Sequence, residues 1–224
     1  MSRREYGQAC SVAEALDHIG ERWSLLIVRE LLLGPLRFSQ LARSVGGAPT
    51  DVLTKRLRDL EHDGIVRRRE LDPPATGVVY ELTELGRGLE RPLVELGRWG
   101  LNFYDAEAVE RIEPTSLANA LRVIFQPPPG ASLTLQLHSE GHASWLRIAN
   151  GWTEAARGEA PDPDLALRGA PGDVIAIFVG GDGAEEGEVE VEGDRKALDA
   201  LRSMVVLPER LREDALTALS AVPT

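Results

Sequence analysis

The stretch LTKRLRDLEHDGIVRRRE, from Leu53 to Glu70, holds six Lys or Arg residues and four Asp or Glu residues, although the whole chain has a formal net charge of -11. Its leucines recur at helical spacing and predict one buried stripe, with polar and cationic side chains on the opposite face. The stripe comprises Leu53, Leu57 and Leu60, and the outer face comprises Asp51, Thr54, Lys55 and Arg58. Gly64 ends this helix, and an arginine run then begins a strand-like segment.

The neighbouring segments complete a recognisable order of elements. Residues 11–34 read as two helices separated by Gly20 and stopped by Gly34-Pro35, and a short helix in residues 37–45 is closed by Gly46-Gly47. IVRRREL and VVYELT form a hairpin around the turn DPPATG. From Thr83, the predicted N-cap, one long amphipathic helix follows, kinked near Pro92. This order predicts a winged helix-turn-helix, in which the long helix enters the major groove of DNA and the hairpin follows the backbone.

The predicted DNA-contacting residues are polar or cationic. They are Arg37, Ser39, Thr50, Asp51, Thr54, Lys55, Arg58, Arg67, Arg68 and Arg69. The arginines suit phosphates or a minor groove because guanidinium groups bind phosphate oxygens with two parallel hydrogen bonds. Asp51 fits least well, unless it accepts from a cytosine amino group or caps the helix together with Thr50. The alternative is a solvated helix and hairpin, or a winged helix that contacts protein.

Several motifs together resemble the HxlR family of bacterial transcriptional regulators along nearly all of residues 8–101. These are the N-terminal cysteine, IGERWSLLIVRELLLG, RFSQL, LTKRLRDLEHDG and the YELTELG that follows the wing. The resemblance implies a homodimer, joined by the first and last helices of the domain, that binds a palindromic or direct-repeat operator near a promoter. This chain has Pro49 where the family usually has Ser, and Asp51 where a basic or polar residue is usual, so base preference there is open.

Apolar residues on the helix after the wing exceed what a small core covers, which independently predicts a partner helix. The predicted dimer interface is Val12, Leu16, Leu89, Leu93, Leu96, Trp99 and Phe103. The single cysteine, Cys10, lies just before the first helix, where a helix N-terminus lowers a thiol pKa. The resemblance implies a sensor of oxidants or electrophiles there, and a small residue packed in the interface is the alternative.

The second half of the chain differs from the first in its charge balance and in its pattern of secondary structure. Residues 1–105 carry 15 Lys or Arg against 16 Asp or Glu, whereas residues 106–224 carry 10 against 20. We expect a winged-helix domain in residues 1–106, a linker in 107–116 and an α+β domain in 117–224, closed by a helix in PERLREDALTALSA. An acidic C-terminal domain is repelled by DNA, so it leaves the basic face to the first domain.

Residues 117–207 resemble the sterol carrier protein 2-like fold through LTLQLHSEGHASWLRIANGWTEAARG, PDPDLALRG and EVEVEGDRKALDALRSM. The fold class is therefore α+β, with an N-terminal winged helix-turn-helix domain and a C-terminal sterol-carrier-like domain. That resemblance implies an apolar tunnel for a hydrophobic small-molecule effector. Its candidate lining is Phe125, Leu137, Trp145, Ile148, Trp152, Ile177 and Phe178. The alternative is that these residues fill an ordinary hydrophobic core.

Other kinds of site find little support. His138 and His142 flank a predicted hairpin turn without a third ligand, and the GGDG of residues 180–183 lacks the Lys and helix of a phosphate loop. We expect no metal, no cofactor and no enzyme activity, and the lack of a long apolar run predicts a cytoplasmic protein. The expected partners are double-stranded DNA and a second copy of the chain. The competing function is a carrier of hydrophobic ligands whose winged helix mediates protein assembly.

Overall fold

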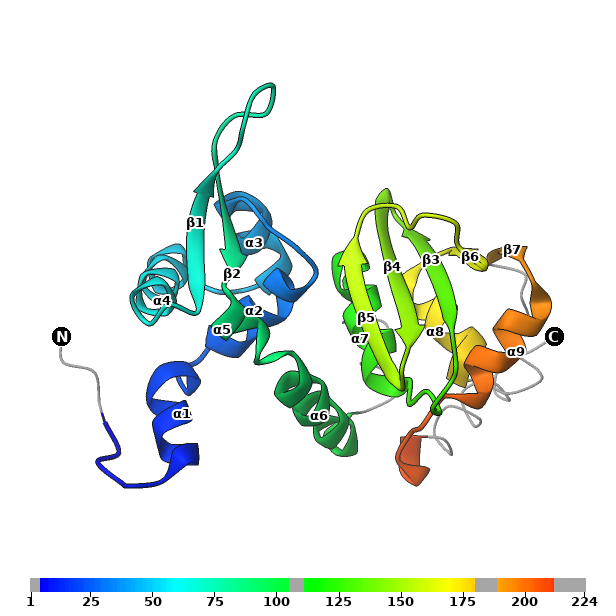
Figure 1. The fold of residues 1–224 in the computed structure, drawn as a ribbon, viewed down its shortest axis with the longest axis horizontal. Helices are drawn as coiled ribbons and strands as arrows, with labels where there is room; N and C mark the ends of the chain where they lie inside the picture. The colour runs from blue at the N-terminus through cyan, green and yellow to red at the C-terminus, as the bar shows by residue number, and fades with distance from the viewer. Residues whose placement is uncertain (1–4, 105–110, 180–188, 212–224) are drawn as a thin grey trace. The chain divides into compact units, whose positions relative to one another are not determined.

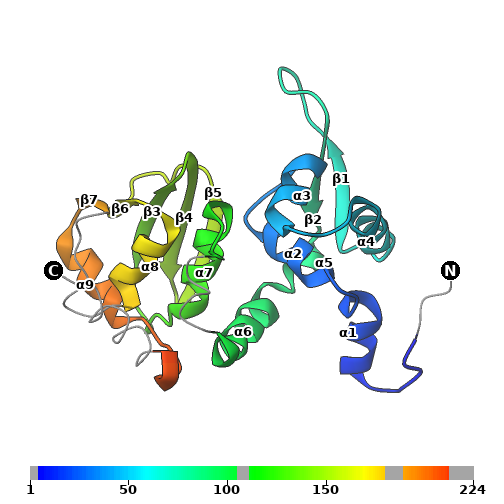
Figure 2. The same cartoon turned by 180° about the vertical axis from the view of Figure 1, so that it is seen from behind.

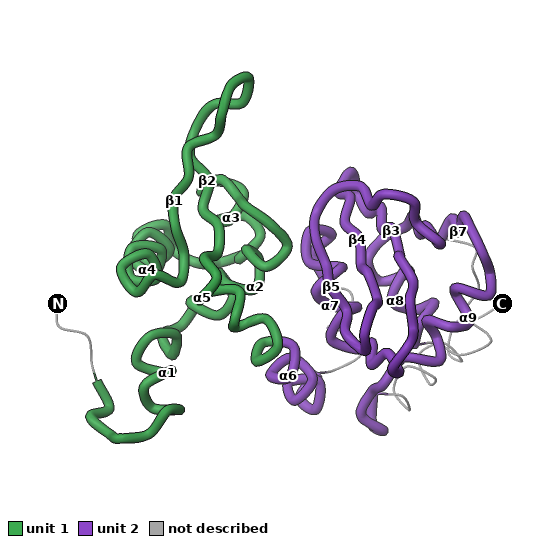
Figure 3. Tube along the Cα trace, viewed as in Figure 1, with its two compact units in different colours: residues 1–93 green, residues 94–224 purple. Residues whose placement is uncertain are grey.

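The computed structural model describes residues 5–104, 111–179 and 189–211 (Figure 1). The chain divides into two compact units, residues 1–93 and 94–224, shown in different colours in Figure 3. This division falls inside a helix, ahead of the boundary at residues 106 and 107 that the sequence predicts. That predicted boundary lies outside the described residues.

The N-terminal unit has the predicted order of elements. It contains α1 (Ser11–Ile19), α2 (Ser24–Leu32), α3 (Phe38–Val45), α4 (Thr50–His62), β1 (Val66–Glu70), β2 (Val78–Leu82), α5 (Glu84–Arg87) and the start of α6 (Glu90–Gly100). Fully buried side chains from α2, α3 and α4, among them Ile27, Leu41 and Leu53, form its core. Helices that each bury one apolar stripe therefore support a two-stranded hairpin, which is the winged helix-turn-helix fold.

The prediction of one long helix after the wing is wrong, because the structure has two helices there, α5 and α6. Thr83 caps the first, as predicted: its hydroxyl oxygen accepts from the Gly86 N–H at 3.2 Å. The break lies at Gly88 and Leu89 instead of near Pro92. Pro92 occupies the first turn of α6, where a missing N–H leaves no helical hydrogen bond unmade.

The β1–β2 hairpin forms the wing. Its strands are antiparallel, with Val66 opposite Leu82 at the base and Glu70 opposite Val78 toward the tip. Leu36 pairs with Tyr80 through both backbone hydrogen bonds, so the segment before α3 attaches to β2. Figures 1 and 2 both show the hairpin tip extending beyond the helices of this unit. The base is anchored in the core, and the tip lies outside it.

The C-terminal unit is α+β, as the sequence predicts, and the structure shows that its sheet is mixed. Its elements are η1 (Leu101–Phe103), η3 (Pro114–Ser116), α7 (Leu117–Ile124), β3 (Leu133–Ser139), β4 (His142–Ala149), β5 (Trp152–Arg157), β6 (Leu165–Arg168), α8 (Pro171–Val179), β7 (Glu190–Gly193) and α9 (Arg195–Ser203). The strand order is β5-β4-β3-β6-β7, with β6 parallel to β3 and the other pairs antiparallel. Helices α7 and α8 cover one face of this sheet (Figures 1 and 2).

Two segments singled out in the sequence fall wholly or mostly outside the described residues. The GGDG of residues 180–183 lies outside them, as does most of the predicted closing helix. Within the described part of the chain, no helix is long and apolar enough to cross a membrane.

Candidate nucleic-acid interface

Helix α4 presents the predicted polar face. Leu53, Leu57 and Leu60 are at most 2% exposed, so the helix is fixed to the core along one stripe. Its N-cap is Pro49, and no side chain caps the helix, so the predicted cap by Thr50 and Asp51 is absent. The Thr54 hydroxyl donates to the Thr50 carbonyl at 2.7 Å, which leaves its oxygen available as an acceptor. Asp51 is exposed in the first turn.

The cations of α4 differ in how firmly they are held. Arg56 is largely buried and pairs with Glu21 at 3.2 Å and with Asp59 at 3.0 Å, which ties the helix to the segment before α2. Lys55 also pairs with Asp59, at 3.2 Å, but this pair is solvent-exposed and worth ~0.5 kcal/mol. Arg58 is exposed and makes no ion pair with the described residues. Lys55 and Arg58 are therefore the cations that can turn toward a phosphate or a base.

The three wing arginines all contact other side chains of the hairpin, which the sequence pattern does not indicate. Arg67 and Arg69 lie on one face of the hairpin, and both pair with Glu81 of β2, at 2.7 and 2.9 Å. Arg69, together with Arg67, holds the pKa of the Glu81 carboxyl below its ordinary value, although burial of the side chain acts in the opposite direction. Arg68 faces the other way and lies over the Tyr80 ring, 5.9 Å from its centroid. No sequence motif singles out Glu81, and only the hairpin register places it opposite Arg67.

Arg37 links the helix-turn-helix to the wing. It precedes α3, and its Nη2 donates to the Thr76 carbonyl at 2.5 Å. An added Cβ on Gly77 would lie 2.6 Å from Arg37 Nη1, so the guanidinium occupies the space that glycine leaves open. Ser39 is exposed in the first turn of α3. The side chain predicted to contact DNA thus also holds the hairpin tip.

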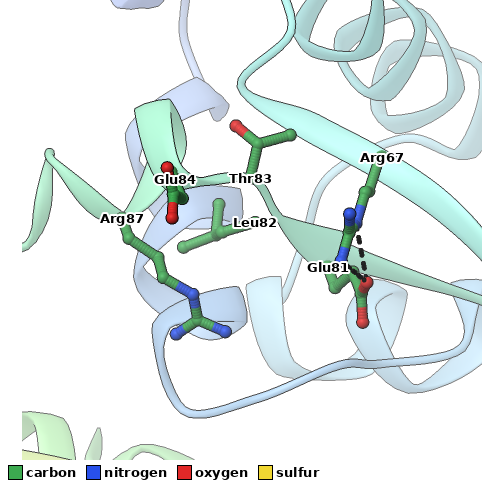
Figure 4. Close-up of a pocket in the computed structure, with 6 residues that line it drawn as sticks. All are labelled: Arg67, Glu81, Leu82, Thr83, Glu84 and Arg87. Carbon is green, nitrogen blue, oxygen red and sulfur yellow. Dashed lines mark hydrogen bonds and ion pairs between the residues drawn. The ribbon is translucent and has the colours of Figure 1, made fainter.

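A pocket of about 350 Å³ opens at the base of the wing (Figure 4). Its lining comes from β1, β2 and α5, and consists of Arg67, Glu81, Leu82, Thr83, Glu84 and Arg87. Figure 4 shows the Arg67 guanidinium turned toward Glu81, whereas Arg87 reaches in from α5. Two carboxylates balance the two guanidinium groups, so the pocket has no strong preference for an anion or a cation.

The residues predicted for a dimer interface divide into two groups. Val12 and Leu16 on α1, and Leu96, Trp99 and Phe103 in α6 and η1, are 40–70% exposed. The Trp99 and Phe103 rings form an edge-to-face pair with centroids 4.9 Å apart. Leu89 and Leu93, however, are half-buried and pack against the core of the N-terminal unit. These two do not contribute the exposed surface that the sequence predicts.

Cys10 is exposed and occupies the N-cap position of α1. The backbone N–H groups of Ala13 and Val12 lower the pKa of its thiol, because they stabilise the thiolate at the start of the helix. An exposed sulfur with a lowered pKa is more reactive at neutral pH than an ordinary cysteine. The thiol is accessible within the single chain, and its place in an assembly stays a prediction.

The predicted tunnel residues lie mainly in the core of the C-terminal unit. Phe125, Leu137, Ile148, Ile177 and Phe178 are at most 5% exposed, and the Phe125 and Phe178 rings meet edge to face at 5.1 Å. Trp145 and Trp152 are only half-buried. This packing is what ordinary core residues show. Ligand binding by these residues, and the sterol-carrier-like fold, stay predictions.

The histidine pair lies as predicted. His138 and His142 sit at the ends of paired strands, on either side of a tight turn formed by Glu140 and Gly141. Nε2 of His138 lies 3.7 Å from Glu159. Within the ranges that the structure describes, no cluster of three or more potential metal ligands is found.

Comparisons with known proteins match the N-terminal part. The model of the family described as HxlR-like helix-turn-helix matches residues 18–108. The uncharacterized HTH-type transcriptional regulator sll1512 of Synechocystis is 34% identical over 106 residues, which cover 47% of this chain and 78% of that protein. The uncharacterized HTH-type transcriptional regulator Mb3122 of Mycobacterium bovis is 43% identical over 100 residues, covering 45% of this chain. That match spans only 61% of the mycobacterial protein.

Among solved structures, the redox regulator HypR in its oxidized form is similar. It is 35% identical and aligns with a TM-score of 0.40 over 43% of this chain and 99% of its own.

Proposed function

This chain belongs to the HxlR-like helix-turn-helix family of transcriptional regulators, and on that premise we propose how it binds an operator. Helix α4 enters the major groove, where Thr54, Lys55 and Arg58 reach base edges and nearby phosphates. The β1–β2 wing follows the adjacent backbone, where its arginines contact phosphates. Asp51, at the same end of α4, accepts from a cytosine amino group or disfavours other bases.

The observation that carries this proposal is the division of α4 into two faces. One face is buried to at least 98% at Leu53, Leu57 and Leu60, so the helix is held rigidly. The opposite face carries Lys55 and Arg58 with no strong competing ion pair among the described residues. A fixed helix with adaptable cations on its outer face matches what major-groove reading requires.

We further propose that the operator is bound by a homodimer. The exposed apolar side chains of α1, α6 and η1 supply the contact surface, with Trp99 and Phe103 as its aromatic anchors. Large contiguous apolar patches on a protein surface mark sites of protein–protein contact. A two-fold dimer places its recognition helices about 34–36 Å apart, so the operator has two half-sites roughly one helical turn apart.

Selection of genomic fragments tests the proposal. The wild-type protein is expected to enrich a short set of fragments that share a two-part motif. Lys55→Ala combined with Arg58→Ala should lose this enrichment, because it removes the two adaptable cations of α4. A control, Lys196→Ala, removes an exposed cation from α9 in the other unit and should enrich the same fragments as wild type. Equal enrichment by the α4 variant would overturn the assignment of α4.

A second function, the sensing of electrophiles, is favoured by the exposure and lowered thiol pKa of Cys10. The thiolate would attack an electrophile and form a covalent adduct at the start of α1, next to the exposed Val12. Treatment with N-ethylmaleimide should change operator affinity in the wild type and leave Cys10→Ser unaffected. If both proteins respond alike, or neither does, Cys10 has no sensing role.

A further inference from the structure

Glu81 shares one face of the wing with two arginines, and both of them pair with it. Because side chains alternate along strands, Arg67 and Arg69 of β1 share this face with Val79 and Glu81 of β2. Val79 is 5% exposed and Glu81 is 8% exposed, although they belong to a two-stranded hairpin. Long cationic side chains on such a face can keep their charged ends in solvent while their aliphatic parts lie along buried surface.

The carboxylate of Glu81 is shared between the two guanidinium groups. Arg67 approaches side-on, with Nε at 2.8 Å and Nη2 at 2.7 Å from Oε1. Arg69 donates through Nε to Oε2 at 2.9 Å. The Glu81 side chain is 10% exposed, whereas those of Arg67 and Arg69 are 64% and 41% exposed. The inner edges of both guanidinium groups are therefore fixed, and their outer parts face solvent.

The donors that remain can bind phosphate. A guanidinium has five N–H donors in a rigid fork, and the contacts to Glu81 leave Nη1 of Arg67 and both terminal nitrogens of Arg69 free of that carboxylate. The three side chains together keep one positive charge. We propose that Glu81 is a positioning residue for DNA binding: it holds the Arg67 and Arg69 guanidinium groups in the geometry that contacts the DNA backbone. This inference rests on the proposed function of the wing.

The proposal predicts that removal of the Glu81 carboxylate weakens DNA binding, whereas charge alone predicts the opposite change. A carboxylate near phosphates repels them, so charge counting predicts that removing it strengthens DNA binding. If Glu81 orders two long side chains before DNA binds, its removal transfers the loss of their conformational entropy to the binding step, and DNA binding weakens. Glu70 provides a matched control, since it lies on β1, is exposed, faces away from Arg69 and forms no ion pair within the described residues.

The experiment measures the affinity of each full-length variant for an operator duplex recovered with the wild-type protein. Glu81→Gln is expected to weaken binding about three- to tenfold, by the ordering cost of one or two arginines. Glu70→Gln should bind as wild type or slightly more tightly. In a background with Arg67→Ala and Arg69→Ala, Glu81→Gln should have no further effect, because the groups through which it acts are gone.

Arg69→Lys gives a second test that leaves Glu81 in place, in case Glu81→Gln does not fold. It keeps the charge but lacks the Nε donor to Glu81, so we expect weaker binding. Unchanged affinity in both Glu81→Gln and Arg69→Lys overturns the proposal, as does a loss that persists without the arginines. If Lys55→Ala and Arg58→Ala still weaken binding, only this inference fails. If they too have no effect, the proposed function fails with it.

Discussion

Replacement of Gly77 by Ala tests how the wing is held. Gly77 has φ +108°, a conformation that residues with a Cβ rarely adopt, so alanine strains the backbone by about 1–3 kcal/mol. The new methyl would also lie 2.6 Å from Arg37 Nη1 and 3.4 Å from Cζ. Because this is the end of a flexible side chain, Arg37 moves aside and loses its 2.5 Å bond to the Thr76 carbonyl, which contributes about 0.5–1.5 kcal/mol.

Urea unfolding of three variants separates these two contributions. Arg37→Ala should lose only the hydrogen bond, Gly77→Ala should lose the bond and gain the backbone strain, and the double variant should match Gly77→Ala. Gly172→Ala is the control, because Gly172 has an ordinary φ and open space around its Cα. Operator affinity should fall in all three wing variants. Wild-type stability and affinity in Gly77→Ala would refute this geometry of the wing tip.

Three further outcomes follow from the described contacts. Trp99→Ser should shift the protein from dimer to monomer in sedimentation velocity, since Trp99 is 62% exposed and pairs with Phe103; an unchanged dimer would place the interface elsewhere. The alkylation rate of Cys10 by iodoacetamide should reach half its maximum below pH 9.0, the ordinary value for the thiol, and a midpoint at or above that pH would contradict its lowered pKa. Because the folded-state pKa of Glu81 is depressed, its contribution to stability is present above pH 4.5 and is lost as the pH falls through the lower folded value. The stability difference between wild type and Glu81→Gln should therefore shrink only in acid, and a difference that is constant with pH would contradict the ion-paired state.

The N-terminal fold is largely predictable from the sequence because each element carries its own local signals. The leucine period placed α4 and its buried stripe, and glycines at positions 20, 46 and 64 follow the ends of helices. These are short-range effects, in which the side-chain period and the turn residues agree with the final structure.

The break between α5 and α6 is not visible in the same way. The helical pattern continues through it, and Pro92 is the strongest local breaker in the segment. Gly86 in α5, just before the break, packs directly on the Ile65 carbonyl, where an added Cβ would lie 2.2 Å from the oxygen. This contact joins residues about twenty positions apart, and periodicity contains no information about it.

The residue types of the candidate DNA interface could be predicted from the sequence, but the ion pairs between its side chains could not. The sequence identified Arg67, Arg68 and Arg69, yet only the hairpin register shows that two of them share Glu81. Periodicity also cannot separate a tunnel from a core, and Phe125 and Phe178 pack against each other as core residues.

The salt dependence of operator binding tests the central claim, that α4 contacts DNA, most directly. Fluorescence anisotropy would give the dissociation constant of a labelled operator from roughly 50 to 200 mM salt. For wild type, log affinity should fall linearly with log salt, and Arg58→Ala should reduce that slope by about one if Arg58 contacts a phosphate. An identical slope and an identical affinity for Lys55→Ala and Arg58→Ala would contradict the placement of α4 on DNA.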